Sequence, residues 1–155
     1  MNEKEIAKEI ISKILYITLA TASKDGKPWN TPLYSAYDSE YNFYWLSDQN
    51  GQHSQNIKEN PEVALVIYDS TVSEGQGRGV YIQGKASELT DVDEIEKALG
   101  YIYGRKNKQP RQFIEFQGDY PRRVYKVVSE KFWVNGSETT NGNFVDIKTE
   151  VDLRS

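Results

Sequence analysis

The sequence predicts a mainly β protein, an antiparallel β-barrel with flanking α-helices. Short runs that alternate between apolar and polar residues recur along the chain, which is typical of strands with one buried face. Apolar residues at helical spacing are confined to a few segments between these runs. A length of 155 residues suits one domain, so residues 1–155 are expected to form a single domain.

The first segment predicts a helix that leads into a strand hairpin. Ile6, Ile10 and Ile14 recur at a spacing of four, and Asn2 with Glu5 gives the pattern of a capping box. The period then changes to two. Residues 15–22 and 29–37 read as strands joined by the tight turn that an Asp-Gly pair at 25–26 favours.

Proline and polar residues mark the next elements. Pro32 cannot donate to a strand ladder, so the second strand is expected at an edge or at a bulge. Residues 43–47 predict a third strand. Residues 53–60 predict a short helix that Ser54 could cap and that Pro61 would end.

The second half of the chain continues the same pattern. We expect a buried central strand over 63–68, a glycine-rich loop over 69–78 and a strand over 80–89. An amphipathic helix should follow from Thr90. The remaining strand-like segments are 123–129 and 132–135, and alternation in the tail from Val145 to Leu153 predicts an edge strand.

Composition excludes several classes of function. The chain has no cysteine and one histidine, so disulfides, thiolate sites and a histidine-based metal site are not expected. A net charge of −4 argues against general nucleic-acid binding. No apolar run approaches the roughly 20 residues of a membrane span, and no secretory signal is recognisable. We therefore expect a cytoplasmic protein with neither nucleic-acid nor membrane partners.

A set of short motifs between Ile14 and Leu89 points to a known family. In chain order they are Leu19-Ala20-Thr21, Asp25-Gly26-Lys27-Pro28, Pro32-Leu33, Tyr37-Asp38, Phe43-Tyr44-Trp45-Leu46-Ser47, His53-Ser54-Gln55-Asn56-Ile57, Asn60-Pro61-Glu62-Val63-Ala64-Leu65 and Gly84-Lys85-Ala86. In order and spacing this set resembles the pyridoxamine 5′-phosphate oxidase-like family, and in particular its general stress protein-like branch. The resemblance implies a six-stranded antiparallel FMN-binding split barrel with flanking helices.

The resemblance also implies a cofactor site shared by the two subunits of a homodimer. The second and third strands would flank the flavin ring, and the loop and short helix after the third strand would hold its phosphate. A helix N-terminus suits an anion because its first N–H groups are free. The residues implied for FMN are Asn30, Thr31, Pro32, Trp45, Leu46, Ser47, Gln52, His53 and Ser54, with Trp133 reaching the flavin edge from the second subunit.

Three positions depart from the family pattern. Gly51-Gln52-His53 stands where many members carry Ser-x-Lys, Thr31 stands where the oxidases place an arginine, and Gly79 stands where they carry a glutamine. The pyridoxamine 5′-phosphate oxidase reaction itself is therefore not assigned. The expected function is electron or hydride transfer between FMN and an unidentified small substrate, with no catalytic residue identified.

Three alternatives remain open at the level of sequence. The chain could be a non-catalytic FMN-binding or stress-related protein. It could be a split barrel that uses deazaflavin or haem, or a cofactor-free interaction module. A basic stretch of Arg105, Lys106, Lys108, Arg111, Arg122 and Arg123 is read as a solvated face, with the binding of a substrate phosphate or a cofactor tail as the second interpretation.

Overall fold

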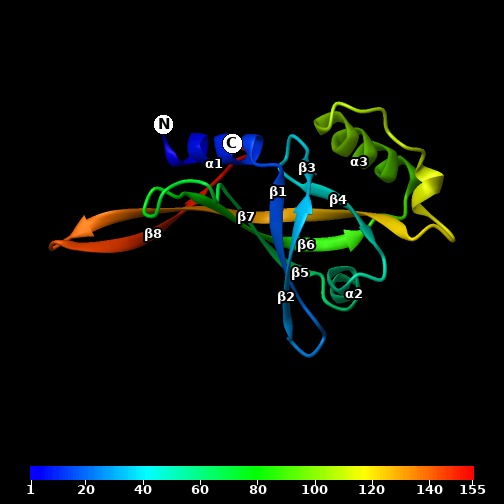
Figure 1. The fold of residues 1–155 in the computed structure, drawn as a ribbon, viewed down its shortest axis with the longest axis horizontal. Coiled ribbons are helices and arrows are strands. Elements are labelled where there is room, and N and C mark those ends of the chain that lie inside the picture. The colour runs from blue at the N-terminus through cyan, green and yellow to red at the C-terminus, as the bar shows by residue number, and fades with distance from the viewer.

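The computed structural model describes all 155 residues. Its strands form one antiparallel sheet (Figure 1). The sheet order is β2-β1-β5-β6-β7-β4-β3, and β8 pairs with β7. The elements are α1 (Glu3–Lys13), β1 (Tyr16–Ala22), β2 (Pro28–Tyr34), β3 (Ala36–Tyr37), β4 (Phe43–Asp48), α2 (Gln52–Glu59), β5 (Glu62–Tyr68), β6 (Gly79–Glu88), α3 (Val92–Arg105), the 3-10 helix η1 (Phe113–Phe116), β7 (Arg122–Thr140) and β8 (Asn143–Val151).

The predicted class is confirmed, with eight strands where the family resemblance implied six. The tail forms β8, which is the edge strand that its alternation predicts. β7 is one continuous strand where the sequence predicted two. Its pairing with β6 moves from Gln83↔Lys131 to Gly84↔Ser129, so a bulge at Glu130 absorbs one residue without ending the ladder.

The start of the chain forms as the local signals predict. Asn2 and Glu5 make the capping box of α1, with both hydrogen bonds at 2.9 Å. The Asp-Gly turn joins β1 to β2, and Pro32 lies on β2 at the edge of the sheet, where its missing N–H costs no ladder bond. None of the helices has the length and apolar character needed to span a membrane.

Two apolar clusters lie on opposite sides of β4. Phe43 and Trp45 point into the barrel interior, while Tyr44 and Leu46 point toward α3. This follows from the alternation of side chains along a strand. The barrel cluster also takes residues from β1, β5, β6 and β7, and the second cluster takes Ile95, Ala98, Leu99 and Ile102 from α3.

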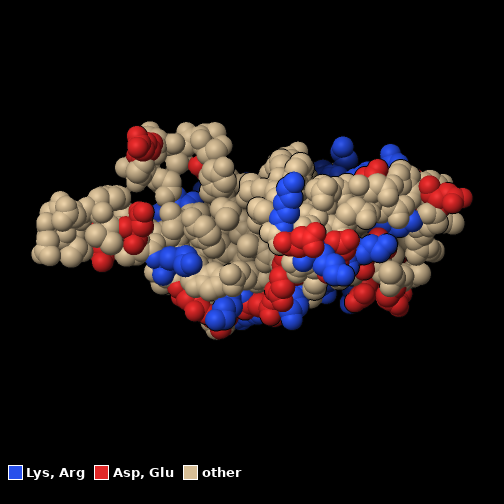
Figure 2. Space-filling model, turned by 90° about the horizontal axis from the view of Figure 1, so that it is seen from below, with Lys and Arg blue, Asp and Glu red and all other residues tan.

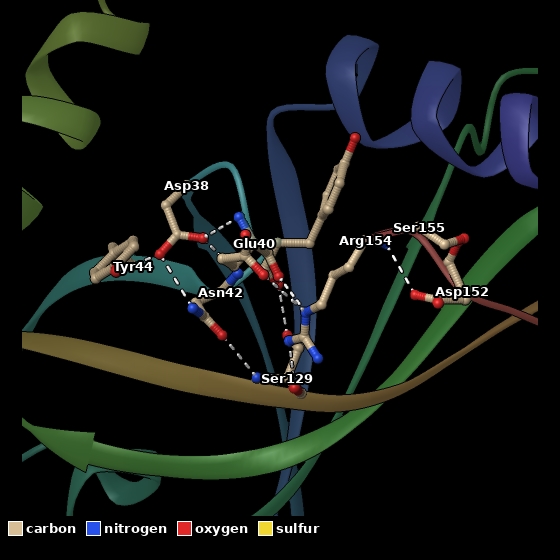
Figure 3. Close-up of polar contacts among 9 residues, drawn as sticks. Asp38, Glu40, Asn42, Tyr44, Ser129, Asp152, Arg154 and Ser155 are labelled. Carbon is tan, nitrogen blue, oxygen red and sulfur yellow. Dashed lines mark hydrogen bonds and ion pairs between the residues drawn. The ribbon is translucent and has the colours of Figure 1, made fainter.

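The C-terminal residues contact the β3–β4 turn and β7 (Figure 3). Leu153 is buried, and Arg154 donates to the Glu40 carbonyl at 2.9 Å and to the Ser129 carbonyl at 2.6 Å. Asn42 accepts from the Ser129 N–H at 3.2 Å. These contacts attach the β3–β4 turn and the chain end to β7 beside its bulge. Beyond this point the β7–β8 hairpin projects from the body, and its tip is mostly uncharged on the face seen in Figure 2.

We expect Gly84→Ala to destabilise the fold by about 1–3 kcal/mol, because a methyl group there would overlap the Val128 carbonyl at the bulge. Gly100→Ala is the matched control. Gly100 lies inside α3 with open space around its Cα, so alanine should stabilise the helix by about 0.5–1 kcal/mol. Urea unfolding of the two variants checks both signs. Equal effects would contradict the close approach at Gly84.

Candidate functional site

The first turn of α2 presents free backbone N–H groups. Gly51 is the N-cap, with extended backbone and no side-chain cap, and the first intrahelical bond runs from the Gln55 N–H to the Gly51 carbonyl at 3.0 Å. The N–H groups of residues 52–54 therefore have no helical acceptor. The turn before the helix is held by Asp48, whose carboxylate accepts from the Asn50 N–H at 2.8 Å. The arrangement is one that can hold an anion.

His53 and Ser47 form a hydrogen-bonded pair beside this turn. The His53 Nε2 and the Ser47 Oγ lie 2.8 Å apart, with Ser47 buried and His53 half-buried. Burial lowers the pKa of His53 below its usual value, because loss of solvent disfavours the charged imidazolium. The imidazole is therefore neutral at pH 7, and an incoming anion would favour its protonation.

The side chains of Ser54 and Gln52 form hydrogen bonds with other groups of the protein. The Ser54 hydroxyl is buried and donates to the Asp48 carbonyl at 2.8 Å, so Ser54 anchors the turn and is not the predicted cap of the helix. Gln52 donates to the Asn56 Oδ1 at 2.9 Å, and Asn56 donates to the Thr21 Oγ1 at 3.0 Å. This chain of amide contacts attaches α2 to β1.

The three β2 residues implied for FMN do not share one face. Thr31 is opposite Leu19, a barrel-interior residue, while Asn30 and Pro32 are opposite Ala20 and Thr18. Residues directly opposite each other in an antiparallel pair share a face of the sheet. Thr31 therefore lies on the inner face of β2, and Asn30 and Pro32 lie on the outer face.

The β4 residues divide in the same way. Trp45 is fully buried in the barrel and stacks on Tyr125, with ring centroids 5.8 Å apart, so its side chain has no surface to offer a ligand. Leu46 packs toward α3. Only Ser47 lies both on the barrel side of β4 and at the strand end beside α2. Adjacent strand residues point to opposite faces, so a run of consecutive candidates could not all line one groove.

Trp133 lies on the outer face of the sheet, opposite Tyr81 and Glu150. Lys148 covers its ring at 5.2 Å from the centroid. Within one chain it is therefore separated by the sheet from the barrel side of β4 that carries Ser47. The structure brings Ser47, Gln52 and His53 together with the Ser54 backbone, and it places the other six implied residues elsewhere or on the edge strand.

Sequence reasoning did not identify Thr21 and Asn56 as contributors to this region. Thr21 and Asn56 form the link that positions α2. Trp29 lies opposite Thr21 on β2, which contacts α2, and it remains 49% exposed. A signal existed for Asn56, which stands four residues after Gln52 and so lies on the same side of the helix.

The chain belongs to the pyridoxamine 5′-phosphate oxidase family, whose sequence pattern matches residues 3–125. A search of curated proteins finds no match. Among solved structures, the chain resembles HutZ, a haem storage protein from Vibrio cholerae, at 18% identity and a TM-score of 0.70, over 86% of this chain and 95% of that one.

Two other structures are similar. One is a protein from Bacteroides thetaiotaomicron proposed to confer 5-nitroimidazole resistance (17% identity, TM-score 0.71, 86% of this chain and 84% of that one). The other is an F420 reductase (21% identity, TM-score 0.58, 81% of this chain and 94% of that one). At these identities the likeness shows the split-barrel fold alone.

The neutral state of His53 has a measurable consequence for stability. Since the pKa is lower in the folded protein, the unfolded chain binds the proton more readily below about pH 6.5. The contribution of His53 to the free energy of unfolding is therefore present above that pH, and it is lost as the pH falls through the pKa of His53 in the folded protein. Urea unfolding at pH 7.5 and pH 5.5 should show a smaller pH-dependent loss in His53→Gln than in wild type, and an identical loss would contradict this assignment.

Proposed function

We propose that this chain is an FMN-binding flavoprotein that transfers electrons or hydride between FMN and a small substrate. The observation that carries the proposal is the His53–Ser47 pair at the uncapped first turn of α2, in a chain of the pyridoxamine 5′-phosphate oxidase family. When bound, the flavin supplies the redox chemistry, and the protein binds and orients it.

The residues present fit a flavin phosphate. The free N–H groups of the first turn would donate hydrogen bonds to its oxygens, and His53 would add a donor that gains a proton when the dianion binds. Thr31 supplies a hydroxyl where the oxidases carry a cation, so less positive charge faces the phosphate. Trp29 offers an exposed aromatic face beside α2 for the flavin ring.

The outer face of the sheet supports pairing of two copies. A row of cross-strand neighbours runs over five strands through Pro32, Thr18, Val66, Tyr81 and Trp133. Tyr81 is 37% exposed, and the five side chains of the row are uncharged, while Glu150 and Lys148 adjoin Trp133 at its β8 end. A row of uncharged side chains with exposed aromatic rings supports an interaction surface. In the proposed homodimer it meets its own copy, and Trp133 of each copy approaches the flavin held by the other.

The alternative cofactors, deazaflavin and haem, differ from FMN in their visible absorption spectra. Two similar structures are described as haem proteins, and one is an F420 reductase. His53 is the single imidazole available to ligate haem, and its Nε2 is engaged by Ser47. The visible absorption spectrum after adding FMN, deazaflavin or haem in turn separates these cofactors, and turnover assays separate an oxidoreductase from a non-catalytic or stress-related FMN-binding protein.

We expect wild-type protein to bind about one FMN per chain, with quenched flavin fluorescence. His53→Ala should weaken FMN binding by about tenfold, because a charge-assisted hydrogen bond to the phosphate is lost. Riboflavin, which lacks the phosphate, should bind both proteins equally. Lys58→Ala, at the far end of α2, is the control and should match wild type. Absence of FMN binding by wild type would refute the proposed function.

The shared site predicts that FMN binding depends on the dimer. Tyr81→Lys should place a charge within the uncharged row, and it should yield monomers with weakened FMN binding. Val92→Lys adds the same charge at an exposed position of α3 and should remain dimeric. Analytical ultracentrifugation with parallel FMN titration checks both variants. Monomeric Tyr81→Lys protein with wild-type affinity would contradict a site between subunits.

A further inference from the structure

The end of β7 and most of β8 form a hairpin that extends beyond the other strands of the sheet (Figure 1). β7 last pairs with β6 at Val134, so residues 135–140 of β7 pair only with residues 143–148 of β8. Residues 137–150 are all exposed. A hairpin of two strands without a third is marginally stable in water, so this segment would gain stability from an additional strand.

The turn at the tip fixes the pairing of the two hairpin strands. Asn141 and Gly142 have positive φ values of 51° and 77°, as a two-residue type I′ turn requires. The register is therefore set within the chain, and the side chains of β8 alternate between two faces. The face that continues from the barrel interior carries Val145, Ile147 and Thr149, and the outer face carries Phe144, Asp146, Lys148 and Glu150.

β8 combines exposed apolar side chains with an open edge. Phe144, Val145 and Ile147 are exposed although each is apolar. β7 is the one strand that pairs with β8, so the backbone groups along the other edge of β8 have no strand partner. An edge of this kind is a template on which a further strand can pair.

The edge strands differ in how they limit such pairing. β2 carries Pro28 and Pro32, which have no N–H to donate to an added strand. β8 contains neither proline nor glycine over its nine residues, and its register with β7 has no bulge. β8 therefore lacks the features that commonly protect an edge strand, and it remains open to pairing.

The sequence of β8 is complementary to itself in antiparallel pairing. A two-fold axis perpendicular to the sheet keeps each face on the same side, so β8 would pair with its own copy about one central residue. Ile147 is the middle residue of the strand, and pairing about it includes all nine residues. Each Asp146 then lies opposite Lys148 of the other copy, and opposite charges in this position stabilise a strand pair.

Other registers lose this agreement. Pairing about Asp146 places two carboxylates opposite each other, and pairing about Lys148 places two ammonium groups opposite each other, both of which are unfavourable. A shift of two residues from Ile147 limits the overlap to residues 143–147 or 147–151. Length and charge therefore favour the same register.

We propose that the free edge of β8 binds β8 of a second copy of this chain, antiparallel about Ile147, and so joins two sheets into one. The contact uses neither the α2 turn nor the uncharged row through Tyr81. It involves one strand where the contact through that row involves five, so it is the weaker of the two and forms at higher protein concentration. Two different two-fold contacts on one chain assemble more than two copies.

Cysteine crosslinking of the full-length protein tests the register, because the chain has no cysteine of its own. Ile147→Cys should give a disulfide-linked dimer on a non-reducing gel after mild oxidation, since directly opposite residues lie within the Cα separation that a disulfide spans. Val145→Cys is the matched control. It lies on the same face and is 40% exposed against 38% for Ile147, but its counterpart would be about 14 Å away along the strand. Equal crosslinking at both positions, or none at residue 147, would overturn the proposal.

Charge reversal tests the pairing without a crosslink. Asp146→Lys and Lys148→Asp should each weaken self-association by about tenfold or more in sedimentation velocity at high protein concentration, because like charges then meet across the pair. An equal mixture of the two variants should recover wild-type association, since each charge again faces its opposite. Asp93→Lys, an exposed reversal on α3, should match wild type. Failure of the mixture to recover would overturn the antiparallel register.

The same measurements in the Tyr81→Lys background separate this contact from the proposed homodimer. Crosslinking at residue 147 and recovery on mixing should persist there, with or without FMN, because the β8 edge includes neither site. Loss of both effects in this background would overturn a separate contact. Absence of both effects from every purified form would mean that β8 does not pair with itself and that its edge is left to a strand of another protein.

Discussion

Trp45 lies fully buried at the centre of β4, with its ring nearly parallel to that of Tyr125 on β7. The stack fixes the register of β4 on β7, and this register sets the position of the turn and of α2, which follow β4 in the chain. Ser47 and Asp48 end the strand, and Ser54 attaches the first turn of α2 to Asp48. A shift of one residue in this pairing would turn Trp45 out of the barrel and carry Ser47 away from His53.

The same strand separates two chemical environments. On its barrel side, the Ser47 Oγ lies 2.8 Å from the His53 Nε2 at the uncapped first turn of α2. On its α3 side, Tyr44 and Leu46 pack toward α3, and Arg122 pairs with Asp48 at the strand end, with its guanidinium 6.0 Å from the centroid of Phe116.

Local sequence signals predicted most of the fold. The capping box, the Asp-Gly turn, the edge position of Pro32 and the alternation of the tail all describe interactions within a few residues. The unbroken β7 was missed because a bulge depends on the neighbouring strand, here on the close approach of Gly84 to Val128. Ser54 was misread as a cap because its true acceptor, the Asp48 carbonyl, is brought close by the turn.

The sequence alone determined the class of fold, the family and the short helix at which an anion can be held, since these depend on periodicity, turn chemistry and motif order. Tertiary structure decided which candidates meet. Strand pairing put Asn30 and Pro32 on the face opposite Thr31, buried Trp45 and turned Leu46 toward α3. It also placed the Arg105 guanidinium on the Ile11 and Ser35 carbonyls, because folding brings α1 and β3 beside the end of α3 although they are far from it in the chain.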